Sequence, residues 1–405
     1  MHLSKALWAL GVLSLAACAA GGGSAIPGAD GAGRQAQFSR ALPATSPSPA
    51  PAATIPPAGA KPAACNGPNT AGKQHCHADK NPLVAPNPDP NPATVVGLAP
   101  ADLRAAYGLP PAAAAAAIGN RVVAVVDAFD DPSAESDLAV YRARFGLPPC
   151  STANGCFHKL NQQGQSDKFP PANAGWGTEI ALDLAMVSAA CPACRIVLVE
   201  ANDDDIDNLS AIVDEAATLA PAAISNSYGT TETAAVVKAN DAHYNHPGVP
   251  IVASAGDTSA VEFPASSKYV IAVTGSALTR DPSQPRGWSE RALASGTGCS
   301  AVEPAPSWQP ARSGCTTRAV GDVAFDADVS SGMAVFNTQD GGWEVLGGTS
   351  AGAPFVAGLY AAAANYGTSA GAQLLYANAA GLNPVTPLAS GAVTALGSPN
   401  GFTGL

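Results

Sequence analysis

The sequence predicts an α/β fold with a doubly wound, mostly parallel central sheet flanked by helices. Short runs rich in β-branched residues, apolar on both faces, predict buried parallel strands: residues 121–127, 195–200, 222–227, 249–254 and 269–273. Helical stretches separate several of these strands: residues 132–145, 177–190, 206–219 and 231–245. Alternation of strand and helix in this rhythm is typical of a doubly wound sheet.

Composition sets the size of the folded part and excludes some partners. The chain has 405 residues, of which 47% are hydrophobic and 13% are charged. This is enough for one large domain or two ordinary ones with a substantial core. The net charge is -11, and lysine and arginine do not cluster anywhere. We therefore expect no nucleic-acid partner and no electrostatic binding to anionic lipid.

The first 18 residues predict export. A short apolar run, Ala6–Ala17, follows a single lysine and precedes small residues, which is the layout of a signal peptide and too short for a membrane span. The run ends in a lipobox-like pattern, so that Cys18 becomes a lipid anchor. Ordinary secretion with cleavage a few residues later is the alternative. Either way, we expect an exported protein that reaches a membrane only through an anchor at Cys18.

Residues 19–97 are dense in Pro, Ala, Gly and Ser and have almost no large apolar side chains. Such a segment buries too little surface to offset the entropy lost on ordering. We expect it to be a disordered tether. The folded domain is then expected to cover residues 98–405.

The nine cysteines also indicate an oxidising compartment. Without Cys18, eight remain in four pairs of close sequence neighbours, which predicts four local disulfides: Cys65 with Cys76, Cys150 with Cys156, Cys191 with Cys194, and Cys299 with Cys315. The third pair has the C-x-x-C spacing of a redox dithiol, which is weak evidence alone. His75 and His77 flank Cys76 and could suggest a metal site. No second ligand pair follows at finger-like spacing, so a surface loop is the better interpretation.

Ser350 is the candidate nucleophile. It lies in "LGGTSAGAPFVAGLY", where Gly347 and Gly348 permit a tight turn and Pro354 falls in the first turn of an apolar helix. A hydroxyl at a helix N-terminus lies near free N–H groups that favour developing negative charge. Helix capping by Thr349 or Ser350 is the simpler alternative. The glycine-rich turn favours a nucleophile.

A serine nucleophile needs a base, and the histidines do not supply one. We interpret all six as surface or tail residues, because none has the small-residue setting of a catalytic histidine: His2, His75, His77, His158, His243 and His246. Glu179 and Asp183 offer an alternative base. They stand four residues apart in "WGTEIALDLAMVSAA", so a helix places both carboxyls on one face.

The surroundings of this acid pair argue against a solvated helix face. Apolar residues cover nearly every other direction of the predicted helix. Burying carboxyls without a partner costs free energy, so a buried acid pair usually has a functional role. Two carboxyls in contact share a proton, which lets Asp183 orient and tune Glu179 as the base, and a carboxylate base suits acidic pH.

Asp257 is a third candidate acid. It follows the predicted strand 249–254 in "ASAGD", where the chain can turn sharply. A loop aspartate after glycine is more often a turn residue. A protonated Asp257 could instead donate a hydrogen bond to an oxyanion.

Taken together, these motifs resemble the sedolisin family of serine-carboxyl peptidases (S53-type), which share the subtilisin-like fold. The resemblance rests on "GGTSAGAP" around Ser350, the Glu179 and Asp183 pair, "SNSYG" at 225–229 and "ASAGD" ending at Asp257, and it spans roughly residues 94–360. It implies a triad of Ser350, Glu179 and Asp183, with Asp257 in the oxyanion hole. It also implies cleavage of polypeptides through an acyl-enzyme at low pH by a sedolisin-like domain in residues 98–405.

Asp127 stands at a strand end, as the triad aspartate of subtilisins does. That arrangement requires a His-Gly-Thr motif, which this sequence lacks. We therefore expect Asp127 to be structural or at most supporting.

Two features differ from the family pattern. The segment before residue 97 is too short and poor in apolar residues to be the family's large folded prodomain. The family also binds calcium near its C-terminus through aspartates, yet no Asp or Glu follows Glu344 and Pro384 stands where an aspartate is expected. Calcium requires six to eight oxygen ligands and usually carboxylate charge, so we expect this site to be lost or weakened.

The sequence leaves three functions to compare. The first is an exported, acid-acting serine-carboxyl endopeptidase, which we expect to be a monomer. The second is a catalytically inactive surface lipoprotein that keeps the fold as a binding scaffold. The third, a hydrolase that uses histidine, lacks a suitable histidine.

Overall fold

The computed structural model describes residue 65 and residues 73–112, 121–309, 314–363, 371–389 and 395–402. Within these, eight strands form the central sheet in the order β11-β10-β8-β6-β3-β5-β4, with β14 also paired with β10. Their bounds are Val122–Ala128 (β3), Phe157–Asn161 (β4), Arg195–Ala201 (β5), Ala223–Asn226 (β6), Ile251–Ser254 (β8), Val270–Arg280 (β10), Trp288–Ala292 (β11) and Val323–Asp326 (β14). The strand pairs are parallel except β10 with β11.

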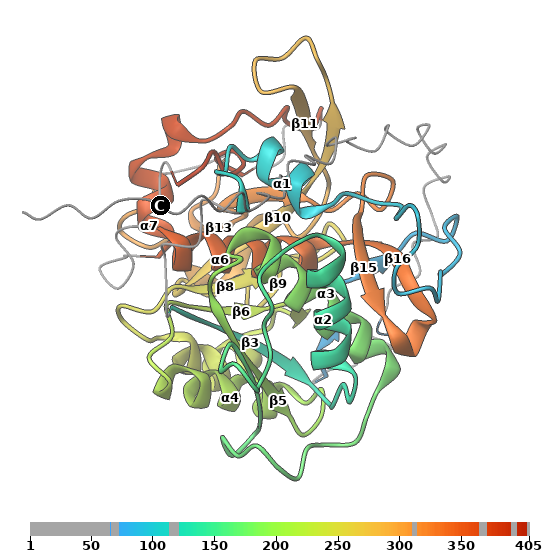
Figure 1. The fold of residues 1–405 in the computed structure, drawn as a ribbon. Coiled ribbons are helices and arrows are strands. Elements are labelled where there is room, and N and C mark those ends of the chain that lie inside the picture. Colours follow the sequence, from blue (N-terminus) through green and yellow to red (C-terminus); the bar gives the residue numbers. More distant parts are fainter. Residues whose placement is uncertain are drawn as a thin grey trace, which may run out of the picture. The chain divides into compact units, whose positions relative to one another are not determined.

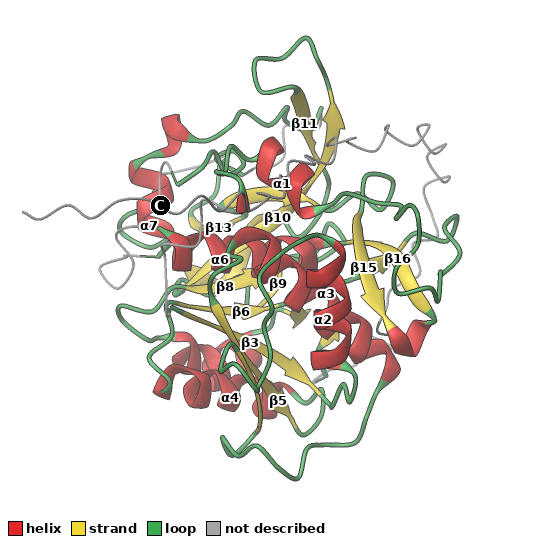
Figure 2. Ribbon diagram, viewed as in Figure 1, coloured by secondary structure: helices red, strands yellow, loops and turns green. Residues whose placement is uncertain are grey.

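Two groups of helices pack on this sheet (Figures 1 and 2). In one group α3 contacts α1, α2 and α6, and in the other α4 contacts α5 and the short helix η2. The α-helices are Pro100–Ala106 (α1), Ala134–Arg144 (α2), Ala174–Ala190 (α3), Ile206–Thr218 (α4), Ala234–Asn240 (α5), Gly352–Ala362 (α6) and Ala372–Ala377 (α7). The 3₁₀ turns are Asp241–Tyr244 (η2), Thr338–Asp340 (η3), Thr349–Ala351 (η4) and Ala379–Gly381 (η5). The predicted fold class is confirmed.

Each predicted strand and helix is present with end shifts of at most three residues, except that β10 continues seven residues beyond the predicted strand 269–273. The predicted helix 231–245 is divided into α5 and η2, and Thr233 caps the first of them by accepting from the Val236 amide. The strands β3, β5, β6 and β8 are buried along almost their whole length, which explains why their sequences are apolar on both faces.

Helix α3 lies deep in the protein. Asn173 begins it by accepting hydrogen bonds from the amides of Gly175 and Trp176. From Trp176 onward every residue of the helix is buried, so the helix has no solvated face there. Helix α6 packs closely against it at Gly358, where an added Cβ atom would stand only 2.7 Å from the Cβ of Ala190. This close packing fixes α6 relative to α3.

Three smaller sheets surround the central one. Their strands are His75–Cys76 (β1), Tyr228–Thr231 (β7) and Glu262–Phe263 (β9) in the first, Met333–Asn337 (β15), Gly342–Gly347 (β16) and Asp79–Lys80 (β2) in the second, and Gly298–Pro304 (β12) and Thr317–Val320 (β13) in the third. Strand β16 leads directly into the turn that carries Ser350.

Residues 73–97 belong to the folded domain, so the expected tether over residues 19–97 is wrong for this part. The Asn81 amide donates to the Val345 carbonyl at 2.9 Å, and Asn87 and Trp343 exchange two backbone hydrogen bonds. These contacts attach the segment to β16. Its composition did not predict this, because its order depends on backbone pairing with distant strands and not on its own apolar side chains.

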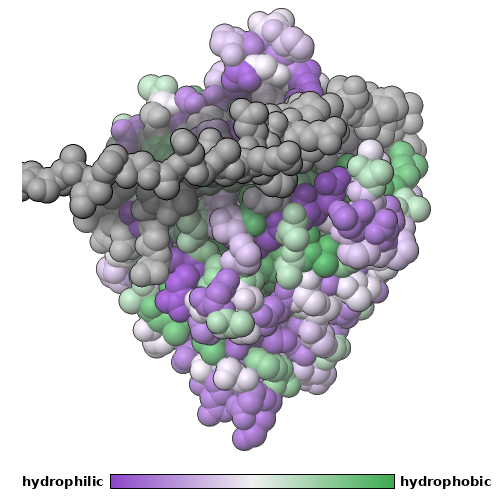
Figure 3. Space-filling model, in the orientation of Figure 1, coloured by the Kyte–Doolittle hydropathy of each residue, from purple (hydrophilic) through white to green (hydrophobic). Residues whose placement is uncertain are grey.

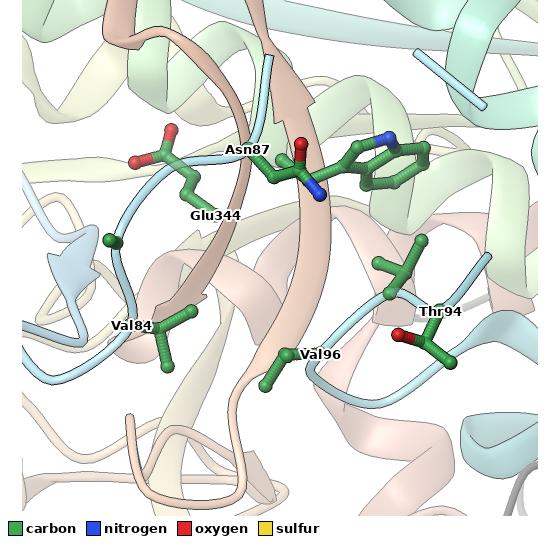
Figure 4. A pocket seen from close by; sticks show the side chains of 8 residues that line it. Val84, Asn87, Thr94, Val96 and Glu344 are labelled. Carbon is green, nitrogen blue, oxygen red and sulfur yellow. The ribbon is translucent and has the colours of Figure 1, made fainter. Parts of the chain in front are cut away.

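A small pocket lies where this segment passes over β16 (Figure 4). Its wall includes none of the candidate catalytic residues and is formed by Val84, Ala85, Asn87, Thr94, Val95, Val96, Trp343 and Glu344.

On the face that Figure 3 shows, hydrophilic residues are mixed with smaller apolar patches.

Glu344 should make the stability of the domain depend on pH. Burial, followed by repulsion from Asp340, raises the pKa of Glu344 from 4.5 to about 7. Between these values the folded state keeps a proton that the unfolded chain releases, so the free energy of unfolding falls as pH rises. The shift corresponds to about 3 kcal/mol. Urea unfolding gives the free energy of unfolding of the wild type and of Glu344→Gln at each pH. The difference between these two free energies should change by about 3 kcal/mol between pH 4.5 and pH 7. A difference that stays constant across this range would contradict the prediction.

All four predicted disulfides are present: Cys65–Cys76, Cys150–Cys156, Cys191–Cys194 and Cys299–Cys315. The predicted signal peptide, the lipobox with Cys18 and most of the expected tether lie outside the described residues. None of the helices in the described ranges combines the length and the apolar character needed to span a bilayer.

Candidate active site

Ser350 lies in the short turn between β16 and α6. Gly348, with a φ of +86°, turns the chain out of the strand, and η4 then places Ser350 two residues before Gly352, the first residue of α6. The predicted order of strand, glycine turn, serine and apolar helix is therefore confirmed. The Ser350 side chain is fully buried, and its hydroxyl donates to the Ser227 carbonyl oxygen at 3.3 Å.

Helix α3 brings Glu179 and Asp183 to the same place. Both carboxyls have no exposed surface. Oε2 of Glu179 accepts a hydrogen bond from the Ala78 amide at 3.0 Å, and Oδ1 of Asp183 accepts one from the Ser227 hydroxyl at 2.8 Å. Ser350 and Glu179 also interact through their side chains, which lowers the pKa of Glu179 in part. Glu179 thus lies next to the serine, as a base would have to.

Burial raises the pKa of both acids above their ordinary values. It is the main cause that raises the pKa of Glu179 well above its ordinary value, with repulsion from Asp183 second. Burial also raises the pKa of Asp183, followed by repulsion from Asp127. Among the described residues, Oε1 of Glu179 and Oδ2 of Asp183 accept no hydrogen bond, although the two side chains interact with each other. A proton shared between the two carboxyls would satisfy both atoms.

Asp127 is a further member of this acidic cluster. It is fully buried at the end of β3, and neither carboxyl oxygen has a hydrogen-bond partner within the described part of the chain. Burial, followed by repulsion from Glu179, raises its pKa well above the ordinary value. The sequence placed Asp127 at a strand end but could not show that the strand end points toward α3.

Asp257 lies on the other side of the Ser350 turn. Its Oδ1 atom accepts a hydrogen bond from the Thr349 amide at 2.7 Å. The Thr349 hydroxyl in turn accepts from the Gly256 amide at 3.1 Å. A Cβ atom added to Gly348 would stand 3.0 Å from Oδ2 of Asp257, so the second oxygen lies beside the glycine turn. The structure therefore brings together all four predicted residues, Ser350, Glu179, Asp183 and Asp257, while their catalytic roles remain predictions.

His77 is a residue of this region that the sequence did not indicate. It was expected on the surface, yet only 2% of it is exposed. Its Nδ1 atom lies 2.6 Å from the Ser254 hydroxyl, and its Nε2 atom lies 2.8 Å from Oε2 of Glu262. Both ring nitrogens are thus occupied by groups other than Ser350. The ring does not act as the base of a serine and histidine pair in this arrangement.

Metal ligation is a separate question for this region. His75, His77 and Glu262 offer ligand atoms within 4.8 Å of one another. The hydrogen bonds of the His77 ring to Ser254 and Glu262 already account for this arrangement without an ion. The weakened calcium site expected near the C-terminus stays a prediction.

Comparisons with known proteins point to a single family. No protein-family model matches the chain. Kumamolisin from Bacillus sp. (strain MN-32) is 30% identical over 263 residues, which covers 56% of this chain and 46% of kumamolisin. Xanthomonalisin from Xanthomonas sp. (strain T-22) is 38% identical over 118 residues, 25% of this chain and 14% of that protein. Sedolisin from Pseudomonas sp. (strain 101) is 37% identical over 117 residues, 26% of this chain and 20% of sedolisin. The chain therefore spans less than half the length of these curated relatives.

The fold agrees with the sequence matches. The solved structure of Pseudomonas sedolisin, a serine-carboxyl proteinase in complex with two molecules of pseudo-iodotyrostatin, superposes with a TM-score of 0.56 at 20% identity. The superposition covers 72% of this chain and 89% of that structure. At this identity the likeness concerns the fold alone. Over these regions the chain is therefore similar in sequence to kumamolisin, xanthomonalisin and sedolisin, and in fold to sedolisin.

Proposed function

We propose that this protein is an exported serine-carboxyl endopeptidase that hydrolyses peptide bonds through an acyl-enzyme at acidic pH. One observation carries the proposal: three separate parts of the chain bring Ser350, the Glu179 and Asp183 pair, and Asp257 to one buried site. Four disulfides in the described residues support export to an oxidising compartment.

In the proposed reaction, Glu179 takes the hydroxyl proton of Ser350 as the serine oxygen attacks the substrate carbonyl. Asp183 holds the remaining proton of the acid pair and keeps Glu179 oriented. The Ser350 amide and a protonated Asp257 donate hydrogen bonds to the oxyanion. Glu179 then returns its proton to the leaving amine, and water hydrolyses the acyl-enzyme by the same steps.

The proposal requires acidic conditions for a physical reason. A carboxyl group donates a hydrogen bond to an oxyanion only while it is protonated, and a carboxylate at the same place repels the oxyanion. Activity should therefore fall once Asp257 ionises. The histidine-dependent alternative predicts the opposite, because an imidazole base works only after it has lost its proton.

A pH profile tests the proposal directly. Purified protein is incubated with casein and with a quenched peptide library between about pH 3 and pH 8. Ser350→Ala serves as the inactive control, and Glu215→Gln, a change on helix α4, serves as the control for substitution. We expect acid-favoured cleavage in the wild type and in Glu215→Gln only. Cleavage that peaks above neutrality would contradict the proposal, and no cleavage at any pH would favour the inactive scaffold.

A further inference from the structure

Three side chains with metal-binding groups lie together beside strand β7. His75 and His77 are two residues apart, a spacing that places side chains on one side of an extended chain. Glu262, on β9, lies on that side, and the ligand atoms of the three side chains are all within 4.8 Å of one another. The sequence alone showed no third ligand, because Glu262 comes close only through the pairing of β1 and β9 with β7.

The ligand atoms converge on one carboxylate oxygen. Nε2 of His77 lies 2.8 Å and Nε2 of His75 lies 3.5 Å from Oε2 of Glu262. Zinc binds imidazole nitrogen and carboxylate oxygen at about 2.0–2.2 Å in tetrahedral geometry, which places neighbouring ligand atoms about 3.3 Å apart. The two observed distances lie on either side of this value. Movements of about half an ångström would therefore admit an ion between the three atoms.

Hydrogen bonds hold His77 in place but leave His75 almost without partners. Both ring nitrogens of His77 have a partner, the Ser254 hydroxyl at 2.6 Å and Glu262 at 2.8 Å. Nδ1 of His75 is buried and has no hydrogen-bond partner among the described residues. Its Nε2 atom lies 3.5 Å from Glu262, longer than the usual N–H···O distance of about 2.7–3.2 Å. A mostly buried imidazole with so few contacts requires an explanation, and a bound ion supplies one.

Ser254 provides the outer contact that a metal-binding imidazole usually has. A histidine ligand generally donates its other ring N–H to an oxygen atom, which fixes the ring and leaves the opposite nitrogen free to bind metal. The Ser254 side chain has no exposed surface, and its hydroxyl lies beside Nδ1 of His77. When Nδ1–H donates to this hydroxyl, the lone pair of Nε2 points toward Glu262.

Gly229 keeps the space beside these atoms open. It lies opposite His75 in the pairing of β1 with β7. A Cβ atom added to Gly229 would stand 2.5 Å from Oε2 of Glu262 and 2.9 Å from Nε2 of His77, two of the three atoms that would bind the ion. The side chain of His75 is 21% exposed, so an ion and a water molecule as fourth ligand can enter from its side.

We propose that His75, His77 and Glu262 bind a divalent transition-metal cation of the zinc class. Two imidazoles and one carboxylate suit zinc and its neighbour cobalt, whereas calcium and magnesium prefer oxygen ligands alone. The bound ion joins residues 75–77 to β9. It thereby holds this segment beside Ser350, whose amide donates to the His77 carbonyl oxygen at 3.4 Å.

Metal titration of the full chain tests the site. Ser350→Ala serves as the parent protein, because it cannot degrade the sample by the proposed activity, and a chelator first removes any metal. Cobalt is added at about pH 7, where protons compete little for the ligands, and the visible absorption of four-coordinate cobalt is followed. We expect one cobalt ion per chain and its displacement by zinc, which binds such ligands more tightly. A parent protein that binds neither ion would overturn the proposal.

Substitutions in the parent protein separate the proposed ligands from other histidines. His75→Gln and Glu262→Gln should each weaken zinc binding by about 100-fold or more, because each removes a direct ligand. Ser254→Ala should weaken it by about tenfold, because it removes only the outer contact. His243→Gln is the matched control, since His243 also lies beside a carboxylate, Asp214 at 2.7 Å, but on η2. Equal affinity in the parent and in His75→Gln, or loss in His243→Gln alone, would overturn the assignment.

Hydrogen–deuterium exchange tests the role of the ion. Saturating zinc should slow exchange of the backbone amides of residues 75–80 in the parent protein but not in His75→Gln, because the ion opposes local opening of the segment. The thermal midpoint of each metal-free variant shows whether it is folded. Exchange in this segment that saturating zinc leaves unchanged in the parent protein would overturn the holding role.

Discussion

If Glu179 is the proposed base, replacing it by glutamine should lower kcat/KM for a peptide substrate by about 10⁴-fold or more, as the loss of a catalytic base does in serine peptidases. The amide cannot take the Ser350 proton and cannot return one to the leaving amine. Ser350→Ala should cause a loss of similar size. Because the two side chains act in one step, the double variant should be little worse than either single one.

The control for this result is Glu215→Gln, which keeps the same chemical change on helix α4. Glu179→Gln with most of the wild-type activity would show that another group is the base. Losses that multiply in the double variant would show that Ser350 and Glu179 act independently.

Replacing Asp257 by alanine should lower kcat by about 100- to 1,000-fold with little change in KM. The substitution removes the proposed oxyanion donor, which would stabilise the transition state more than the bound substrate. Its Oδ1 atom also accepts from the Thr349 amide, which holds the turn before Ser350. The variant should therefore be checked for an unchanged thermal midpoint.

Asp257→Asn separates the two roles of this residue. An amide accepts from the Thr349 backbone as the carboxyl does, and it donates to an oxyanion at every pH. We expect this variant to keep more activity than Asp257→Ala and to extend activity toward neutral pH. If activity falls toward neutral pH in Asp257→Asn at the same pH as in the wild type, the assignment of Asp257 as the proton-dependent donor is contradicted.

Short-range patterns in the sequence predicted most of the central fold and identified the residues that the structure brings together at the candidate site. The spacing of Glu179 and Asp183 on an otherwise apolar helix indicated a buried acid pair, because a four-residue spacing places side chains on one face. The glycines before Ser350 indicated the turn into α6 in the same local way. Such features depend on residues close together in the chain, so they could be predicted without knowing the fold.

The position of residues 75–80 could not be predicted in this way. Strands β1 and β2 are two residues long, and their partners β7 and β16 lie about 150 and 265 residues further along the chain. His77 is buried because of Ser254 and Glu262, which no local pattern connects to it. The position of Asp127 against α3 likewise depends on how the sheet and the helix pack.

The buried acids of this protein should make both its stability and its proposed activity depend on pH. Burial raises the pKa of Glu179, Asp183, Asp127 and Asp326 well above the ordinary value. The native fold therefore holds protons that an unfolded chain gives up above about pH 4, and alkalinisation favours unfolding. A pH low enough to keep these carboxyls protonated also favours the protonated form of Asp257, the proposed oxyanion donor. A neutral compartment should therefore lower both the stability of the fold and the proposed activity.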